Sequence, residues 1–290
     1  MNCQSKKLPI KSWNLYNQIL YNAMYDSNPT KSLAYGNKAI AKFYIGRPLW
    51  LYISDDFSLD DTRKFIHECQ NLHSLNLAEM SGVITSHRAA QICQEFMPAA
   101  ASWELTAMCI KQKPTHNPHN KLVVPTAENL PTISRWLKSF YQEGLLQNIL
   151  EENSSNMAKA LIKGKKLYCL TPKIPETTPK TISVEKTAQN TTIQTKIQTK
   201  IKAETKEIKA MIMQTPLPNK ISRLNLIYVP PESRGNGFAK DIISLLVNNL
   251  QQQGNLPVLY VRTANVPAVR LYESLGFVEV GKLTELRFAH

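Results

Sequence analysis

The residues with the clearest chemical meaning form a short loop at positions 234–237, Arg-Gly-Asn-Gly. An apolar run that ends at Pro230 precedes this loop, and apolar residues at helical spacing follow it as far as Gly254. The loop therefore joins a predicted strand to a predicted helix. Glycines permit close backbone approach, so free amides of the turn and of the helix N-terminus can converge on an anion such as a pyrophosphate, with Arg234 at the rim. The loop has neither the Gly-Lys-Ser/Thr sequence of nucleotide hydrolases nor the three-glycine spacing of dinucleotide-binding proteins, so it predicts another kind of phosphate binder.

Two segments in the second half of the chain carry a more specific pattern. They read Val229-x-Pro231-Glu232-x-Arg234-x-x-Gly237-x-Ala239 and Asn265-x-x-Ala268-x-x-Leu271-Tyr272-x-x-Leu275-Gly276-Phe277. The former resembles the coenzyme A pyrophosphate loop of the GNAT superfamily of N-acyltransferases, and the latter is similar to the other cofactor segment of that superfamily. The resemblance covers residues 121–290. It implies a mixed, centrally splayed sheet with helices on both faces.

The resemblance also implies a cosubstrate and the residues that bind it. Acetyl-CoA would donate an acetyl group to an amine acceptor, a small molecule or a peptide, without a metal ion. Its pantetheine arm would pair with the backbone of Ile227, Tyr228 and Val229, and Asn265 would lie beside the arm. The pyrophosphate would be held by Arg234, Gly235, Asn236, Gly237, Phe238 and Ala239.

Acetyl transfer needs a proton for the departing thiolate, an amide donor for the developing oxyanion and an unprotonated amine. The resemblance places Tyr272 near the sulfur, where its phenol can act as the general acid; the alternative is a packed aromatic residue on the helix over 267–275. We expect the backbone amide of Val229 to be the oxyanion donor.

The general base is poorly determined by the sequence. Asn225 occupies the strand position from which an acidic residue could act, but an amide does not accept a proton at neutral pH. Glu143, at the end of the first helix of this unit, and Glu285, on the last strand, are candidates, each with a surface or structural role as the alternative. Relay through solvent is a third possibility.

The length of 290 residues favours two domains, although one large domain is possible. The segment 114–120 contains two prolines and polar turn formers, so we expect a linker there and domains at 1–120 and 121–290. The first unit reads as α+β, with strands and helices intermixed. No cofactor loop can be drawn in it, and it is either a degenerate copy of the same fold or a scaffold that shapes the acceptor site.

The following elements are expected from hydrophobic periodicity and capping signals. The first unit has helices at 12–24, from Ser58 and at 86–96, and strands at 39–53 (a hairpin), 81–85 and 103–111. The second has strands at 122–124, 167–170, 209–214, 224–229 and 257–262, and helices from Thr126, at 238–253 and at 267–275.

Most of the net charge of +13 lies in one segment, because residues 163–220 hold 12 lysines and no arginine against 4 glutamates and no aspartate. Within it, residues 171–209 contain ten threonines, the near-repeat at 193–201, and no leucine, glycine or aromatic residue. Both helix and strand are conceivable there, but so little apolar surface favours a flexible, solvated insertion in a hairpin. We do not expect nucleic acid as a partner. A polyanion-binding protein acting through these lysines is nevertheless one alternative function, and a catalytically silent CoA-binding or regulatory module is another.

Neither a secretory signal nor a membrane span can be read at the N-terminus, and we expect a cytoplasmic protein. The five scattered cysteines suit buried, reduced thiols. His116 and His119 have the spacing of a metal pair but no third ligand nearby, so we interpret them as linker residues. The oligomeric state and the acceptor's identity stay open.

Overall fold

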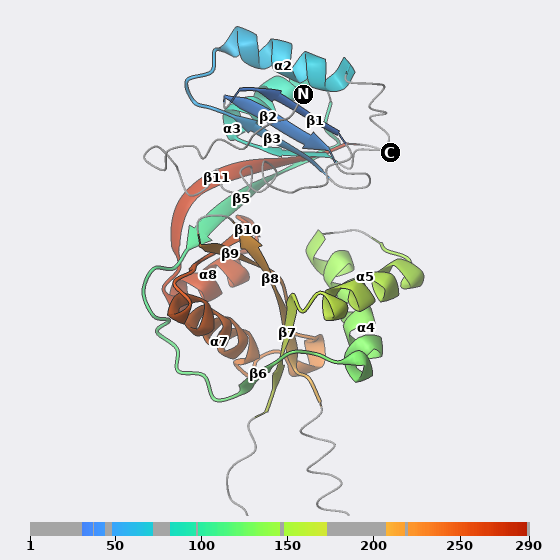
Figure 1. The fold of residues 1–290 in the computed structure, drawn as a ribbon, viewed down its shortest axis with the longest axis vertical. Helices are drawn as coiled ribbons and strands as arrows, with labels where there is room; N and C mark the ends of the chain where they lie inside the picture. Colours follow the sequence, from blue (N-terminus) through green and yellow to red (C-terminus); the bar gives the residue numbers. More distant parts are fainter. Residues whose placement is uncertain are drawn as a thin grey trace, which may run out of the picture.

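Eleven strands of the described residues join into one mixed sheet in the order β1-β2-β3-β4-β11-β5-β10-β9-β8-β7-β6. The structure is a computed structural model, and it describes residues 31–36, 38–43, 48–71, 82–96, 98–145, 148–172, 207–217 and 220–288. The sheet bends strongly, and the long strands β11 and β5 curve from the upper half of the molecule into the lower half (Figure 1). The fold class is α+β, with helices on both faces of the lower half of the sheet, as the sequence predicts.

The described elements of the first half follow an order that the later part of the second half repeats. The first half contains β1 (Lys31–Tyr35), β2 (Ala39–Phe43), β3 (Leu49–Ile53), α2 (Leu59–Asn71), β4 (Gly82–Thr85), α3 (His87–Phe96) and β5 (Ala101–Cys109). The second half begins with β6 (Lys121–Val123), η4 (Ala127–Asn129), α4 (Leu130–Leu145) and α5 (Glu151–Lys163). It then runs through β7 (Leu167–Thr171), β8 (Ala210–Leu217), β9 (Ile221–Tyr228), η5 (Pro231–Ser233), α7 (Phe238–Gln252), β10 (Leu256–Arg262), α8 (Val266–Leu275) and β11 (Val278–Arg287).

The halves exchange their last strands. Strand β5 of the first half pairs with β10 of the second, and β11 of the second half pairs with β4 of the first. The strands on either side of α2, β3 and β4, are parallel, and so are the strands on either side of α7, β9 and β10. The sheet order is thus nearly palindromic about β11 and β5, which supports the expectation of a degenerate copy. A domain boundary at residue 120 remains a prediction, because each half contributes a central strand to the other.

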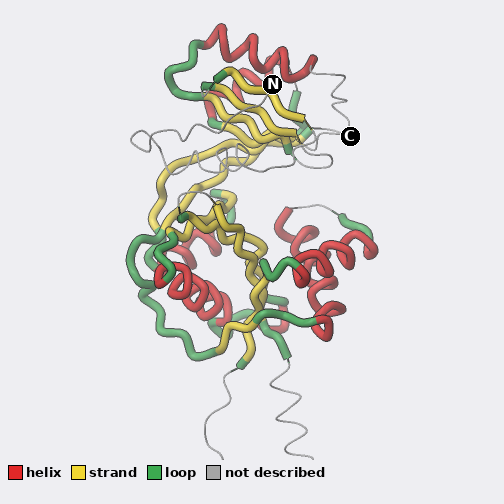
Figure 2. The backbone as a smooth tube through the Cα atoms, in the orientation of Figure 1, coloured by secondary structure: helices red, strands yellow, loops and turns green. Residues whose placement is uncertain are grey.

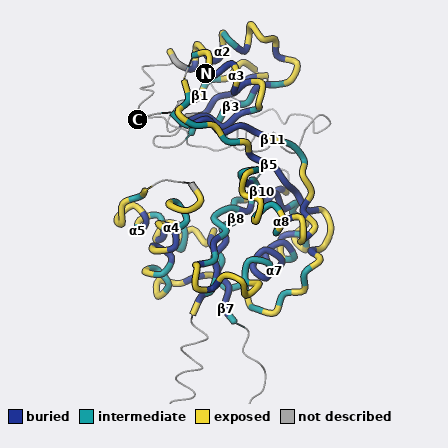
Figure 3. Tube along the Cα trace, turned by 180° about the vertical axis from the view of Figure 1, so that it is seen from behind, coloured by how far each residue is buried: buried dark blue, intermediate teal, exposed yellow. Residues whose placement is uncertain are grey.

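Helices α2 and α3 of the first half and α7 and α8 of the second pack their apolar faces on the outer side of the bent sheet. The first core lies between α2, α3 and the upper strands and includes Phe65, Leu51 and Leu286. The second lies under α7 and α8 and includes Leu246 and Leu259. A third core lies beneath α4 and α5 on the opposite face of the lower strands. The second half of β5 and residues 283–286 of β11 are buried, whereas β11 begins with exposed residues (Figure 3); Figure 2 distinguishes the strands from the helices around them.

Most expected elements are present close to their predicted bounds. The hydroxyl of Ser58 accepts a hydrogen bond from the amide of Asp61 at 3.0 Å, so the predicted start of α2 is confirmed. Strands β7 and β8 pair directly, and the ends of the long insertion therefore meet as expected. Strand β1 and helix α5 were not predicted, because β1 has only five residues and the apolar pattern of α5 is weak.

Several predictions concern residues outside the described ranges, namely the helix at 12–24, the turn at 46–47, Cys3 and most of the insertion. The other four cysteines are buried and unbonded to each other, as expected. Burial raises the pKa of Cys69 and of Cys169 to about 12, so these thiols are inert at neutral pH. No helix in the described part of the chain is long and apolar enough to cross a membrane.

Candidate active site

The loop before α7 has the geometry of an anion cradle. Gly235 and Gly237 have φ angles of 82° and 77°, in the left-handed region that favours glycine. A Cβ atom added at either position would meet no atom within 4 Å, so both glycines border open space. Gly237 is also the N-cap of α7, whose first amides have no partner within the helix. Amides and open space therefore meet at the predicted anion site.

Strands β9 and β10 separate next to this loop. Their parallel pairing runs from Ile221 opposite Leu256 to Leu224 opposite Leu259 and extends no further. On its other side, β9 carries an extra residue against β8, because the register shifts between the pairs Met211–Tyr228 and Met213–Asn225. Leu226, within this bulge, has a φ of 49°. The bulge re-aims the last residues of β9 away from the ladder and leaves a gap between the two parallel strands.

An ion pair ties the loop to α4. A nitrogen of Arg234 lies 2.6 Å from Oε2 of Glu143, and its Nε donates to the carbonyl oxygen of Val229 at 3.0 Å. The hydroxyl of Tyr228 donates to the other oxygen of Glu143 at 3.1 Å, and the Arg234 guanidinium lies 5.8 Å from the centre of the Tyr228 ring. Burial, with the nearby Glu143 carboxylate, raises the pKa of Tyr228. Glu143, Tyr228, Val229 and Arg234 thus lie together, with both carboxylate oxygens of Glu143 already engaged.

Helix α8 supplies the other predicted residues. Asn265 is its N-cap, and its side-chain oxygen accepts a hydrogen bond from the amide of Ala268 at 3.3 Å. Tyr272 is only 8% exposed and packs against Phe277, with ring centroids 5.9 Å apart. Burial raises the pKa of Tyr272 to about 12. The phenol is therefore protonated at neutral pH, the form that a general acid needs.

Comparisons with known proteins agree with this geometry. The family model described as "FR47-like protein" matches residues 202–287, which include the loop, the gap and α8. The C-terminal part of this chain is thus similar to N-acetyltransferases of the GNAT superfamily. The whole chain also has the fold of a solved structure described as an acetyltransferase of the GNAT family from Colwellia psychrerythraea, with a TM-score of 0.53 at 14% identity over 95% of this chain and 96% of that one.

Two curated relatives match a shorter part of the chain. A spermidine N(1)-acetyltransferase of Vibrio cholerae is 41% identical over 61 residues, which are 20% of this chain and 35% of that protein. A mycothiol acetyltransferase of Thermomonospora curvata is 39% identical over 62 residues, which are 21% of this chain and 20% of that protein. The matches thus span well under two thirds of either relative, and the acceptors named for them are properties of those proteins.

Glu285 lies apart from the glycine loop before α7. It is 5% exposed on β11, where Nε of Arg287 donates to its Oε1 at 2.7 Å. Arg262 approaches its other oxygen at 3.9 Å. This carboxylate is an ion-paired group on the other face of the sheet from α7 and α8, rather than a partner of Tyr272.

The linker before the GNAT part is fastened to α7 by one buried carboxylate. Asp241 is 3% exposed and accepts hydrogen bonds from the His116 ring, from the side chain of Asn120, and from the amides of His119 and Asn120, both at 3.1 Å. Burial alone would raise the pKa of Asp241, but these hydrogen bonds outweigh it and hold the pKa below its usual value. His116 of the linker therefore has a structural partner, Asp241 of α7.

We expect Asp241→Ala to lower the free energy of unfolding at neutral pH by about 2–4 kcal/mol, because buried amides lose a charged acceptor. Since folding depresses the pKa of Asp241, its stabilisation is present above the ordinary aspartate pKa of about 4 and is lost as the pH falls through the lower folded value. Urea titrations at several pH values measure the difference in the free energy of unfolding between the parent and Asp241→Ala, and this difference should become smaller in acid. The exposed Asp60 gives the control, and equal losses for Asp60→Ala and Asp241→Ala would contradict this role of Asp241.

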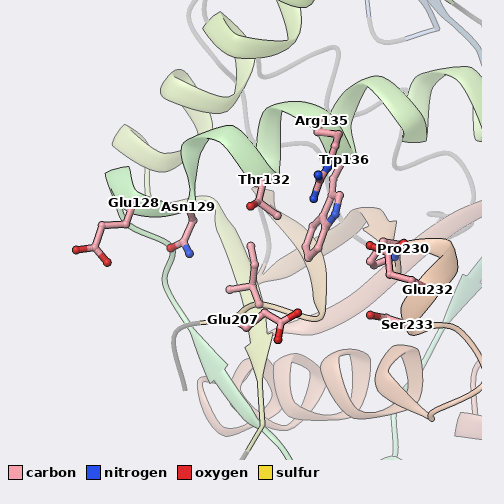
Figure 4. Close-up of a pocket in the computed structure, with 10 residues that line it drawn as sticks. Glu128, Asn129, Thr132, Arg135, Trp136, Glu207, Pro230, Glu232 and Ser233 are labelled. Carbon is pink, nitrogen blue, oxygen red and sulfur yellow. The ribbon is translucent and has the colours of Figure 1, made fainter. Parts of the chain in front are cut away.

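A cavity of about 380 Å³ lies beside the loop, on the face of the sheet that α4 covers. Figure 4 shows carboxylates of Glu128, Glu207 and Glu232 around it, with Trp136 at its wall. Trp136 is 3% exposed, and its indole nitrogen has no hydrogen-bond partner among the described residues. No sequence pattern predicted this cavity, because its lining comes from segments far apart in the chain.

Proposed function

We propose that this protein transfers an acetyl group from acetyl-CoA to an amine. The observation that carries the proposal is the junction of an open glycine cradle at the N-terminus of α7 with a gap between β9 and β10. A pyrophosphate fits the cradle, since it is anionic and the cradle offers helix amides. A slender pantetheine arm fits the gap, since the unpaired edges of two strands provide amides and carbonyls along it.

In this proposal the loop residues Arg234 to Ala239 hold the pyrophosphate, and the backbone of Ile227, Tyr228 and Val229 pairs with the arm. Bound acetyl-CoA supplies an activated acetyl thioester. The amide of Val229, just beyond the end of the β9 ladder, donates to the carbonyl oxygen of that thioester as negative charge develops. Asn265 borders the arm from the N-terminus of α8.

Tyr272 gives its proton to the departing sulfur, and the amine loses its own proton to solvent. We assign no side chain as the base, because both oxygens of Glu143 already accept hydrogen bonds and Glu285 is ion-paired on the inner side of the sheet. Besides its place in the pyrophosphate loop, Arg234 pairs with Glu143 and so fixes the loop against α4.

A second candidate function is a catalytically silent CoA-binding module, which would use the same cradle and gap. Asn225 stands where an acidic base could act, and its Nδ2 donates to Thr215 at 3.1 Å. A catalytically silent CoA-binding module would need no base. Release of free thiol from acetyl-CoA in the presence of a panel of amines separates the two: turnover supports the transferase, whereas binding without turnover by any amine supports the silent module.

A further inference from the structure

The inner face of the bent sheet is continuous across both halves of the molecule. Residues paired across neighbouring strands point to the same side of a sheet. Trp50 is paired with Ile84, Ile84 with Glu285, and Glu285 with Trp103. Leu105, two residues beyond Trp103, is paired with Arg262. These side chains therefore form one surface, on the side away from α2, α3, α7 and α8.

The bend of the sheet brings distant strands of this surface into contact. In the strand order, β3 and β9 are five steps apart, which would be roughly 24 Å in a flat sheet. The guanidinium of Arg223 on β9 nevertheless lies 5.7 Å from the ring centre of Trp50 on β3. The curvature of β5 and β11 (Figure 1) brings the two halves face to face. A molecule held here would contact both halves, close to the bulge of β9.

Arg262 lies within this surface with an unsatisfied guanidinium edge. Its side chain is 15% exposed, and its Cζ lies 4.0 Å from the centre of the Trp103 ring. Its Nε and Nη2 are buried, and neither has a hydrogen-bond partner among the described residues. The nearest carboxylate, Glu285, is 3.9 Å away, beyond hydrogen-bond distance, and binds Arg287 instead. A buried cation with open donors is costly unless a ligand completes it.

The two open donors define the ligand. The Nε and Nη2 hydrogens of an arginine point in the same direction and match the two oxygens of a carboxylate. Three arginines, Arg223, Arg262 and Arg287, reach this surface against one carboxylate, Glu285, so the surface attracts an anion. Nearby on β9, Oδ1 of Asn225 is also buried without a hydrogen-bond partner among the described residues, and it can accept an N–H.

We propose that the inner face binds the acetyl acceptor, and that the acceptor is an amine that also carries a carboxylate, bound in a bidentate way by Arg262. This inference rests on the proposed acetyl transfer. It gives Arg262 the role of a specificity-determining residue and gives the N-terminal half, through Trp50, a share in the acceptor site. Asn225 would accept a hydrogen bond from the amino group beside the bulge.

The test compares three sets of amines with the full chain: free amino acids, their carboxamides, and the corresponding amines without a carboxylate. Thiol release gives kcat and KM, and calorimetry gives the affinity for acetyl-CoA. We expect the free amino acids to be preferred by roughly 10²-fold in kcat/KM. The carboxamides and the plain amines lack the carboxylate and cannot form the charged hydrogen-bonded pair with Arg262. Arg262→Gln should raise KM for the free amino acids by a similar factor, affect the amines without a carboxylate far less, and leave acetyl-CoA binding intact.

Two further variants keep the result interpretable. Arg262→Lys keeps the charge but loses the fork, so its KM should lie between those of the parent and Arg262→Gln. Arg63→Gln removes an exposed arginine on α2 and should change nothing. Equal use of all three sets, a preference for aminoalkyl phosphates, or acetyl-CoA binding without binding or turnover of any amino acid would overturn the inference and leave the cofactor assignment standing. If acetyl-CoA itself did not bind, the proposed function would fail. Calorimetric binding of the amino acids to the parent and to Arg262→Gln would then decide the inference alone.

Discussion

Replacing Gly237 by glutamate should abolish the thermal stabilisation that acetyl-CoA gives this protein. A ligand at about 100 times its Kd stabilises a protein by about 2.7 kcal/mol, which raises the Tm of a chain of this size by roughly 4–5 °C. In the variant, a side chain and a negative charge would occupy the open space in front of the α7 amides. Both the space and the charge complementarity for a pyrophosphate would be lost, so the shift should fall to near zero.

The variant also needs a control for its backbone, because a residue other than glycine at a φ of 77° costs about 1–2 kcal/mol by itself. Gly254 follows the C-terminal end of the same helix and has a φ of 73°. Gly254→Glu therefore adds the same charge under similar backbone strain, away from the loop. We expect it to lower the Tm without ligand but to keep the full shift with acetyl-CoA. If Gly237→Glu were stabilised as much as Gly254→Glu, the pyrophosphate would bind elsewhere.

Tyr272→Phe should slow acetyl transfer by about 10²- to 10⁴-fold, the usual contribution of general acid catalysis. The affinity for acetyl-CoA should stay almost the same, because the ring keeps its contact with Phe277. The free energy of unfolding should also change little, since the hydroxyl has no hydrogen-bond partner among the described residues. The loss should therefore appear in kcat and be absent from binding.

The measurement is turnover with a true acceptor, under conditions in which chemistry is slower than product release. Tyr168→Phe is the matched control. It removes a phenol on β7 whose hydroxyl donates a hydrogen bond to the side chain of Gln214 at 3.2 Å, and it should leave kcat unchanged. A Tyr272→Phe variant as fast as the parent would mean that Tyr272 is a packing residue and that the thiolate leaves unprotonated or takes its proton from water.

The local features of the candidate site could be predicted from the sequence. Glycines at 235 and 237, a strand before them and an apolar helix after them specify a cradle through turn chemistry and periodicity alone. The segment from Asn265 to Phe277 could be recognised because its residues lie within four helical turns of one another. For the same reason the bounds of α7, α8 and β10 agree closely with expectation.

The partners of the catalytic candidates could not be predicted. Glu143 binds Arg234, which lies 91 positions further along the chain. The Asp241 carboxylate accepts hydrogen bonds from a linker more than 120 positions away. An arginine in the apolar strand that ends at Arg262 was a possible signal of the inner face, but its meaning depends on Trp103 and Glu285, which come from other strands.

The sequence by itself determined the glycine loop at 234–237, the segment from Asn265 to Phe277 and the kinds of element that hold them, because these depend on dihedral preferences and on spacing within a few turns of chain. Only the tertiary structure decided the exchange of β5 and β11, the bend that brings Trp50 to Arg223, and the open guanidinium edge of Arg262. Strand order and sheet curvature arise from pairings between distant segments, and no local pattern specifies which distant strand will supply the partner.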